Sequence, residues 1–489
     1  NTINWMPSIG KNNFNVLVGQ EAQRFNQYSS FVSGYDFATP KLMDAANATE
    51  TKGSAYRADA ALASYFGNVE YDYDNRYYVS ASIRRDGSSR FGEDTRWGTF
   101  WSVGAKYRLS AEKFMAATQN WLNNLTVRVS YGTSGNQNVG YYQAQGVYST
   151  TRYAGVSGFG PASLAADNLC WESRNKFDVG LEFTLFNALT IEADYYYDVT
   201  KDMIFDRPLS WATGFGSIPT NIGSMSNQGV EIQLNAMLIN KRNFRWTLGL
   251  NITTNKNKVI ELPDHQAIAS GSLGRIEEGK SVGSFYMVEW AGVDPATGRP
   301  RWYDANGDYV YNYGDAALRW VGNSQPKFYG GIQTTFEFYD FDLGLQFNYN
   351  YGNKMFSNDC WYIENVGDEA GQITTYYVMD NRWKRPGDET FVPQLINNGN
   401  NGSKNVSTRF LIDGSYLRLK SLVLGYNLPK KHCQKIYLSS LRIYASIDNL
   451  FTVCSPDFRG YDPEAGLSGT QQSNYPVPVN YTFGINVGF

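Results

Sequence analysis

Apolar and polar side chains alternate with a period of two residues from one end of this 489-residue chain to the other. The final stretch, "VNYTFGINVGF", places Tyr481, Phe483, Ile485, Val487 and Phe489 on one face and polar or small residues on the other. Successive side chains of a β-strand point to opposite faces, so the pattern predicts two-faced strands. Termini of soluble domains usually fray, whereas an alternating strand with an aromatic last residue indicates a terminus that is held in a sheet.

About fifteen segments show this alternation, and several run to about fifteen residues or more. Clear examples are 189–200, 230–238 and 341–351, in which apolar residues fall at every second position. The phase slips near Ser421, which predicts a β-bulge. The predicted strands are 1–8 (in part), 14–37, 58–72, 76–86, 96–109, 122–133, 171–186, 189–205, 223–239, 244–258, 326–339, 341–355, 408–428, 438–452 and 479–489.

The connections between these strands alternate between short and long. The short ones include 72–75, 186–189, 240–243, 339–341 and 429–437. A longer connection on the same side, 110–121, predicts one or two helical turns opened by Ser110. The long ones cover 134–170, 206–222, 259–325, 356–407 and 453–478. Short turns at one end and long loops at the other are typical of an outer-membrane β-barrel, and if the last strand runs towards the periplasm, every long loop lies outside the cell.

The composition favours a membrane barrel over a soluble β-protein. Hydrophobic residues make up 42% of the chain and charged residues 18%, against about a quarter charged in average soluble domains. No run of about 18 apolar residues occurs, which excludes transmembrane helices but not transmembrane strands. Soluble sandwiches have strands of about five to six residues, and no propeller repeat of about 40 to 50 residues is present. The predicted fold class is therefore all-β, a transmembrane antiparallel β-barrel.

Several functional classes find no support in the residues. The formal net charge of −3 gives no basic stripe for a nucleic-acid partner. No acid–base pair, nucleophile or metal cluster stands out, so we expect neither an enzyme nor a cofactor. The cysteines form no CxxC pair and leave at most one disulfide open, and the histidines lie in no catalytic signature. These residues are Cys170, Cys360, Cys433, Cys454, His265 and His432.

One segment carries a specific family resemblance. The stretch "YYVSASIRRDGSSRFGEDTRWGTFWSVGAKYRLSAEKFM", at 77–115, resembles the hallmark segment of SusC/RagA-like TonB-dependent outer-membrane transporters of the Bacteroidetes. Further stretches resemble the family in order and cover almost the whole chain: "LTVRVSYGTSGNQNVGYY", "LCWESRNKFDVGLEFTLFN", "NIGSMSNQGVEIQLNA", "GVDPATGRPRWYDANGD", "RWKRPGD", "YLRLKSLVLGYNLP", "LRIYASIDNLFT" and "GYDPE". The motif core is Arg84, Arg85, Asp86, Gly87, Ser88, Ser89, Arg90, Phe91 and Gly92, and the terminal Phe489 is similar to the assembly signal of bacterial outer-membrane proteins.

The resemblance implies a barrel of about twenty-two strands around a plug. Residues 1–489 would then form the C-terminal part of the barrel. The opening "NTINWMPSIG" carries no secretory signal. We therefore expect the plug, the TonB-contacting segment and about seven strands to lie upstream, outside this chain.

The resemblance also implies a function. Family members import oligosaccharides or peptides beneath a SusD-like lipoprotein that caps the extracellular mouth, with energy supplied through TonB, and their barrels contact outer-membrane lipid. Two alternatives stay open. One is a TonB-dependent transporter for iron chelates or cobalamin, which the RRDGSSRFG and GYDPE stretches disfavour. The other is a non-transporting surface barrel or adhesin, which a plug and TonB segment in the full chain would exclude.

Aromatic residues in the long loops are the candidate cargo contacts, because sugars need flat apolar faces beside planar polar groups. For any single residue, packing within its loop or contact with the lipoprotein is the favoured interpretation. The longest loops, 259–325 and 356–407, are the expected partner-contacting surface. The substrate-binding candidates are Trp290, Trp302, Trp320, Trp361, Tyr362 and Trp383, with Trp211, Tyr286 and Tyr303 in or beside the long loops.

"YDANGDYVY", at 303–311, has the acidic spacing of a calcium loop at Asp304, Asn306 and Asp308. The twelfth position holds Asp315 rather than glutamate, and flanking helices are lacking. The Asn-Gly pair at 306–307 instead predicts a hairpin turn, and we expect no metal.

Charged and aromatic residues near strand ends have structural interpretations. The motif arginines are predicted to join an arginine–carboxylate network that faces the lumen or plug. Glu172, Asp462 and Glu464 are predicted to join similar networks. Interfacial girdle positions are predicted for Tyr77, Tyr78, Trp97, Trp101, Tyr195 and Tyr197.

Overall fold

The computed structural model describes residues 1–489 except 370, 398–401, 467–468 and 474. Strands dominate the described residues, and seventeen of them belong to one hydrogen-bonded sheet. The chain divides into two compact units, of which the first holds Asn1–Tyr107, Arg128–Asp178 and Asp198–Ser224, and the second Arg108–Val127, Val179–Tyr197 and Met225–Phe489. In the described part of the chain, no helix is both long and apolar enough to cross a membrane.

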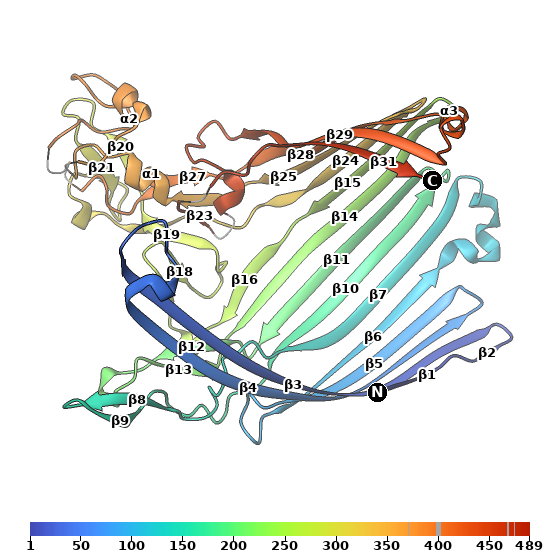
Figure 1. Ribbon diagram of the computed structural model, residues 1–489, viewed down its shortest axis with the longest axis horizontal. Helices are drawn as coiled ribbons and strands as arrows, with labels where there is room; N and C mark the ends of the chain where they lie inside the picture. The colour runs from blue at the N-terminus through green and yellow to red at the C-terminus, as the bar shows by residue number, and fades with distance from the viewer. Residues whose placement is uncertain (370, 398–401, 467–468, 474) are drawn as a thin grey trace. The chain divides into compact units, whose positions relative to one another are not determined.

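The first unit is an antiparallel meander with two further hairpins (Figure 1). Strand β3 pairs with β4 from Asn12↔Tyr73 to Phe37↔Ala48, and β4 pairs with β5 only from Leu62↔Ser88 onward. Both β3 and β4 have 26 residues, which is about 85 Å at ~3.3 Å per residue, so their hairpin extends well past the end of β5. The strands are β1 (Thr2–Trp5), β2 (Ser8–Ile9), β3 (Asn12–Phe37), β4 (Ala48–Tyr73), β5 (Tyr77–Ser88), β6 (Trp97–Arg108), β8 (Tyr148–Tyr153), β9 (Val156–Pro161), β12 (Ile204–Pro208) and β13 (Ser217–Asn221).

The second unit contains a second meander in which strands consecutive in the sheet are antiparallel. Strands β7 (Leu122–Asn136), β10 (Glu172–Leu185) and β11 (Leu189–Lys201) contribute residues to both units. The meander strands are β14 (Ser224–Lys241), β15 (Phe244–Thr253), β24 (Phe328–Phe338), β25 (Phe341–Tyr351), β28 (Tyr416–Asn427), β29 (Ser440–Cys454) and β31 (Asn480–Gly488), with β16 (Lys256–Glu261) after β15 and helix α3 (Lys430–Lys435) between β28 and β29.

The long connections of the second unit fold into a loop module with its own small sheets. Antiparallel strands build two of them, β17–β18–β19–β23 and β20–β21–β22, and β27–β26–β30 forms a third. The elements are β17 (Ile268–Ser270), β18 (Gly274–Ile276), β19 (Ser284–Val288), β20 (Trp290–Val293), β21 (Pro300–Tyr303), β22 (Tyr309–Val310), β23 (Leu318–Asn323), β26 (Lys354–Ser357), α1 (Asn358–Ile363), α2 (Tyr376–Asn381), β27 (Leu411–Asp413) and β30 (Thr470–Gln471).

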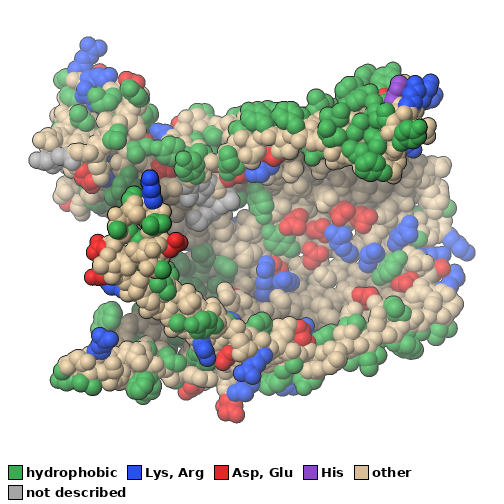
Figure 2. All heavy atoms as spheres, in the orientation of Figure 1, with side chains coloured by type: hydrophobic (Ala, Val, Ile, Leu, Met, Phe, Trp, Pro, Cys, Tyr) green, Lys and Arg blue, Asp and Glu red, His purple; other side chains and the backbone are tan. Residues whose placement is uncertain are grey.

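Apolar side chains of the meanders remain exposed on one face of the sheet. In the first unit these include Val79, Ile83 and Val103. In the second unit Phe483 of β31 is 83% exposed although its strand is fully paired with β29, and hydrophobic side chains gather over β29 and β31 in Figure 2. A soluble sandwich would bury this face against a second sheet. Exposure to lipid is the environment that stabilises it.

The fold class and the predicted strands are confirmed, with differences at their ends. Strand β4 begins at Ala48, ten residues before the predicted 58, because its added residues pair with β3 rather than with β5. The predicted strand 408–428 is a 3-10 turn (Thr408–Phe410), β27 and β28. The connection 110–121 forms 3-10 turns at Leu109–Ala111 and Lys113–Thr118, but no side chain caps them. The predicted loops 356–407 and 453–478 include the positions that lie outside the described residues.

The predicted bulge near Ser421 is confirmed and falls on Lys420. Leu419 pairs with Phe347 and Ser421 with Gln346, so Lys420 has no partner on β25. The same residue is skipped in the pairing with β29. An unpaired extra residue re-aims the neighbouring side chains, which matters for the loop anchor described below.

A glycine in β24 carries a testable packing constraint. A Cβ at Gly330 would lie 2.0 Å from the Asn251 backbone oxygen, which also accepts a 2.7 Å hydrogen bond from Tyr349 Oη. We expect Gly330→Ala to destabilise the barrel by about 1–3 kcal/mol, the usual cost of overpacking. A Cβ added at Gly344 of the neighbouring β25 would have no other heavy atom within 4 Å, so Gly344→Ala is the control. Heat-dependent gel mobility of the two variants measures the difference, and equal stability would contradict this assignment.

Candidate functional site

The hallmark motif lies at the end of β5 and in the turn that follows. Arg84 donates from Nε to Asp86 Oδ1 (2.6 Å) and from Nη2 to Glu21 Oε2 (3.2 Å) and Ser64 Oγ (2.9 Å). These residues come from β3, β4 and β5, so one guanidinium cross-links three adjacent strands on the polar face. Charge-assisted bonds of this kind are short and geometrically specific.

Contrary to the prediction for the motif arginines, Arg90 pairs with no carboxylate in the described residues and Arg85 does not join this network. It follows Arg84 in a strand, so its side chain points to the opposite, apolar face. There its guanidinium lies 5.6 Å from the ring centroid of Trp97. Strand alternation therefore gives the two adjacent arginines different environments.

The rest of the motif attaches the 134–170 connection to the strand end. Arg90 donates to the Val139 carbonyl (2.6 Å) and lies over the Tyr141 ring at 4.5 Å. Phe91 is buried with Val139, Ala166 and Leu169. A Cβ at Gly92 would lie 2.1 Å from the Asp167 carbonyl oxygen, so a glycine is required where the two segments meet.

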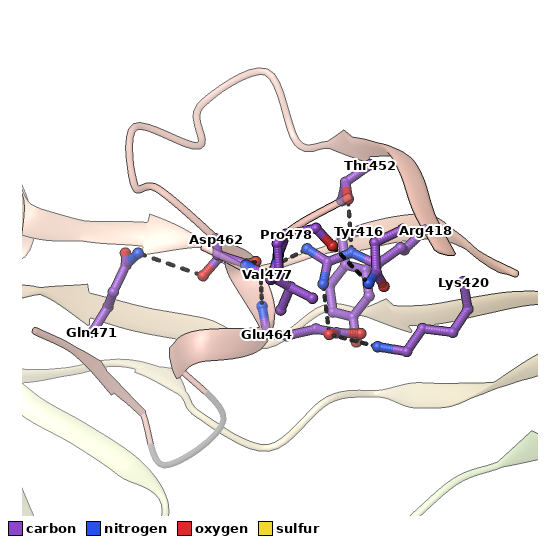
Figure 3. A network of polar contacts seen from close by, with 10 residues as sticks. Tyr416, Arg418, Lys420, Thr452, Asp462, Glu464, Gln471, Val477 and Pro478 are labelled. Carbon is purple, nitrogen blue, oxygen red and sulfur yellow. Dashed lines mark hydrogen bonds and ion pairs between the residues drawn. The ribbon is translucent and has the colours of Figure 1, made fainter. Parts of the chain in front are cut away.

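A second charged cluster anchors the final long connection to β28 (Figure 3). Arg418 donates from Nη2 to Asp462 Oδ1 (2.7 Å), from Nη1 to Glu464 Oε2 (2.6 Å) and from Nε to Thr452 Oγ1 (2.8 Å). The bulged Lys420 also reaches Glu464 Oε2, at 3.4 Å. Arg418 is 3% exposed and Asp462 2%. We call Arg418, Asp462 and Glu464 the Arg418 cluster; the structure thus gives Asp462 and Glu464 an arginine partner.

Asp462 also organises the backbone of its own segment. Its carboxylate accepts from the backbone N–H groups of Val477 and Glu464, each at 2.9 Å. Burial by itself raises the pKa of the Asp462 carboxyl, but these two N–H groups and the Arg418 guanidinium outweigh burial and hold that pKa below its ordinary 3.8. The Asp462 carboxylate is therefore charged at neutral pH.

Glu172, the third predicted network acid, has a weaker set of contacts. It accepts from Asn136 Nδ2 at 3.3 Å. No arginine or lysine lies within ion-pair distance of its carboxylate in the described residues. Its preceding residue, Trp171, packs against Phe91 and Phe100 with ring centroids 5.2 and 5.5 Å away.

The loop module has a hydrophobic interior that uses several of the candidate cargo aromatics. Trp302 is 0% exposed and lies in a cluster with Val288, Trp290 and Val293. Trp383 packs against this cluster and donates to the Pro295 carbonyl at 2.9 Å. Trp302 thus presents no surface to a ligand in this structure. Trp290, Trp302 and Trp383 all contribute to packing of the loop module. Alternation along short strands such as β21 puts Trp302 inward and its neighbours outward.

The remaining candidates keep some accessible surface. Trp361 is partly buried and donates to the Lys404 carbonyl (2.6 Å), whereas its neighbour Tyr362 is exposed. Trp320 contacts Tyr286 with ring centroids 4.8 Å apart, and the Lys280 ammonium lies 5.2 Å from the Trp320 ring. In the first unit, Trp211 is exposed at the turn between β12 and β13.

The "YDANGD" stretch forms the predicted hairpin turn between β21 and β22. Asp304 Oδ1 accepts from the backbone N–H groups of Asn306, Gly307 and Asp308, each at 2.9 Å. These bonds lower the pKa of the Asp304 carboxyl, of which the bond from Asp308 contributes most. The carboxylate is thus committed to shaping the turn. No group of three or more metal-ligating side chains occurs among the described residues.

Two arginines of the loop module, the fully buried Arg409 and the partly buried Arg459, were not predicted from the sequence. Arg409 donates to the carbonyls of Ser403 (2.9 Å) and Glu364 (3.2 Å), and burial lowers its pKa to about 10. Arg459 donates to Glu364 Oε1 (2.8 Å) and to the Arg409 carbonyl (2.7 Å). Arg459 lies 95 positions from Glu364 and 50 from Arg409, and Arg409 lies 45 positions from Glu364, so no local spacing could have revealed these pairs.

Comparison with known proteins gives consistent results. A family model described as "TonB dependent receptor-like, beta-barrel" matches residues 3–450. "TonB-dependent receptor P3" of Formosa agariphila is 30% identical over 100% of this chain and 52% of its own length. "TonB-dependent receptor SusC" of Bacteroides thetaiotaomicron is 27% identical over 100% of this chain and 49% of its own length. The chain thus spans about half the length of the curated relatives it matches.

A solved structure agrees with these relatives. The RagAB peptide transporter matches with a TM-score of 0.88 and 29% identity, over 100% of this chain and 55% of that chain. The same assembly in its "open-open" state matches with a TM-score of 0.88 and 28% identity, over 100% of this chain and 54% of that chain.

The Arg418 cluster predicts a strong local effect of one substitution. Removing one partner of a buried ion pair costs about 3–5 kcal/mol because it leaves a buried charge without compensation. We expect Arg418→Ala to release residues 455–464 from β28, with rapid amide hydrogen exchange in peptides from this segment. Lys420→Ala is the control, since its more exposed pair contributes about 0–1 kcal/mol. Unchanged protection in Arg418→Ala would refute the anchor.

The same segment should respond to acid in one direction. Because the folded pKa of Asp462 is depressed, its stabilisation is present above the ordinary pKa of 3.8 and is lost as the pH falls through the lower folded value. Exchange protection of residues 455–464 should therefore be constant from about pH 5 to 8 and fall below about pH 3.8. Loss of protection already near pH 6 would contradict this account.

Cys360 offers a reporter for the loop module. Burial raises the pKa of its thiol to about 11, so little reactive thiolate exists at pH 8. In a variant whose other three cysteines are serine, we expect no maleimide labelling at pH 8 until denaturant opens the module. A thiol introduced at exposed Tyr437 as Tyr437→Cys is the positive control. Labelling of Cys360 at the rate of that control would contradict the packing.

Proposed function

This chain belongs to the TonB-dependent receptor-like β-barrel family, and from that premise we propose that the full-length protein actively imports oligosaccharides or peptides across the outer membrane. Its named relatives are TonB-dependent receptors, and none of these names denotes an enzyme. The chain is an outer-membrane β-barrel protein of the SusC/RagA type. Energy would reach it through TonB, and a SusD-like lipoprotein would close its extracellular mouth.

The observation that carries the proposal is the match to the RagAB peptide transporter along the entire chain. At 29% identity and a TM-score of 0.88, the agreement includes the loop module as well as the strands. We assign residues 1–489 to the C-terminal part of the barrel, with long extracellular loops near 134–170, 259–325, 356–407 and 453–478.

The polar face of the second unit suits an uncharged, hydrogen-bonding cargo. A groove of about 410 Å³ crosses β14, β15, β24 and β25. Carboxamides line it, and the glycines at 249 and 331 leave room between them. Each carboxamide offers a donor and an acceptor, as sugar hydroxyls and peptide groups require. The groove's carboxamides are Gln233, Asn235, Asn251, Gln333, Gln346 and Asn348.

The loop module suits a protein lid. Ile373, which lies three residues before α2, is exposed, as are Tyr376 and Met379 in the helix, while Val378 is buried with Val366 and Val392. A rigidly supported helix that displays large apolar side chains is typical of a protein interface. We propose that this surface contacts the lipoprotein, and that accessible Tyr362 and Trp320 contact lid or cargo.

Uptake by living cells tests the proposed function. Cells that express the full-length protein should accumulate fluorescently labelled oligosaccharides or peptides of the host's growth medium, and deletion of TonB should abolish accumulation while the protein stays in the outer-membrane fraction. Accumulation that persists without TonB would refute active import. Binding of cells to surfaces with no uptake would support the adhesin alternative.

Co-purification tests the lid. Tyr376 is 90% exposed and Tyr437, in a short connection at the other end of the meander, is 94% exposed. We expect the double variant Ile373→Asp, Tyr376→Asp to recover at least about tenfold less lipoprotein in mild detergent, as a hot-spot loss of about 1.4 kcal/mol or more produces. Tyr437→Asp is the matched control. Equal recovery from both variants would place the lid contact elsewhere.

A further inference from the structure

Unlike Arg84 and Arg90, which donate hydrogen bonds to other protein groups, Arg85 makes only a cation–π contact in the described residues. It is exposed on the apolar face of β5 and stacks near Trp97. In the described residues no carboxylate lies within ion-pair distance of it, and its contact with Trp97 leaves its five N–H donors open. A charged group on a lipid-facing surface is costly unless it reaches a polar partner. The charge of Arg85 on this surface therefore needs a polar partner from outside the chain.

The register of the first unit places Arg85 at a sharp boundary between polar and apolar rows. One cross-strand row joins Gln20, Tyr65, Arg85 and Thr99. The adjacent row on the same face joins Ile3, Val18, Gly67, Ile83 and Trp101. Polar donors thus lie directly beside a row of aliphatic and aromatic side chains.

A groove of about 600 Å³ follows this boundary. We call it the Gly67 groove, because the missing side chain of Gly67 forms its floor. Its walls include Ile3, Val18, Tyr65 and Ile83, and Arg85 lies at its polar edge. A Cβ at Gly67 would meet only the Leu17 carbonyl oxygen, at an ordinary 3.6 Å. A side chain would therefore fit at position 67, so backbone packing does not explain why a glycine lies there.

Arg85 lies just inside the boundary between the apolar band and the head-group region of the membrane. Tyr77 stacks on Tyr107 near the short turn at 74–75, with ring centroids 4.9 Å apart, and belongs to the predicted girdle. From Tyr77 to Arg85 the strand rises about 26 Å along its length and about 20 Å along the membrane normal at a tilt of about 40°. The apolar band of such barrels is about 25 Å tall. Arg85 thus lies near the boundary of that band on the long-loop side, together with Tyr65 and Trp97.

We propose that the Gly67 groove binds one acyl chain of an anionic, phosphate-bearing membrane lipid whose head group pairs with Arg85. Guanidinium groups bind phosphate oxygens through paired N–H donors, and Tyr65 and Gln20 supply further polar groups in the same row. The groove supplies aliphatic walls for the chain, which lies towards the membrane interior. The site depends on the outer-membrane location of the protein and not on its cargo.

Charge and location favour this occupant over others. A peptide or a second copy of the chain would have to displace lipid from an apolar surface without gaining a hydrophobic driving force, because lipid tails are as apolar as the side chains. A lipid needs no such displacement, and only an anionic head group gains from Arg85.

Native mass spectrometry of the full-length protein tests the site. The protein, purified from outer membranes in mild detergent, would be titrated with lipid A, which carries phosphate, and separately with zwitterionic phosphatidylcholine. We expect lipid A to be retained preferentially. Arg85→Gln should reduce the bound lipid A about fivefold, the loss expected for one arginine at an anionic membrane surface, and Arg85→Lys should retain most of it.

Two further variants separate charge from groove. Gly67→Val should reduce retention of lipid A with the charge intact, because the new side chain fills the floor. Arg57→Gln is the matched control, since Arg57 is another exposed arginine of this face that lies over Tyr28, farther along β4.

Equal retention by wild type and Arg85→Gln, or an equal loss in Arg57→Gln, would overturn the proposal. Should Arg85→Gln fail to assemble, full retention of lipid A by Gly67→Val would overturn it instead. Uptake of cargo is measured separately and does not bear on this result.

Discussion

Continuous antiparallel pairing of the backbone is the interaction on which the rest of this structure depends. In hydrocarbon, an unpaired N–H or C=O group costs several kcal/mol, so every strand must be bonded to neighbours on both sides. In the meanders of both units, long antiparallel registers pair consecutive strands, with an interruption at Lys420 in the pairing of β28 with β25 and β29. Because pairing is provided by the backbone, the side chains are free to specialise, with one face of each strand apolar and the other polar.

The same pairing explains how charged clusters can be held at strand ends. Arg84 cross-links three strands whose positions the ladders have already determined. The Arg418 cluster uses an interruption of the ladder, since the bulge at Lys420 brings two basic side chains towards the acids of the last long connection. The Arg84 network joins β3, β4 and β5 to one another, and the Arg418 cluster attaches the last long connection to β28. They thereby position long loops that would otherwise have few restraints.

Sequence reasoning succeeded where the physical signal was local. Alternation predicted the strands, a phase slip predicted the bulge, and the Asn-Gly pair predicted the turn between β21 and β22. It failed where the outcome depended on distant partners. For Trp302 and Trp290 the sequence left cargo contact, packing and partner contact open, and only the fold shows that they lie in the interior of the loop module. Arg85 was assigned the same role as Arg84 because both belong to the motif, although adjacent residues of a strand point to opposite faces.

What the sequence by itself determined is the alternating pattern of side chains, and with it the fold class, the lipid-facing surface and the family. These follow from period-two hydrophobicity and from motifs that can be read in order along the chain. What only the tertiary structure decided is which loop side chains are buried, which acids meet Arg418, and that an apolar groove lies beside Arg85. Those outcomes join residues that are tens of positions apart, and long-range contacts depend on the packing of several segments at once rather than on any local spacing.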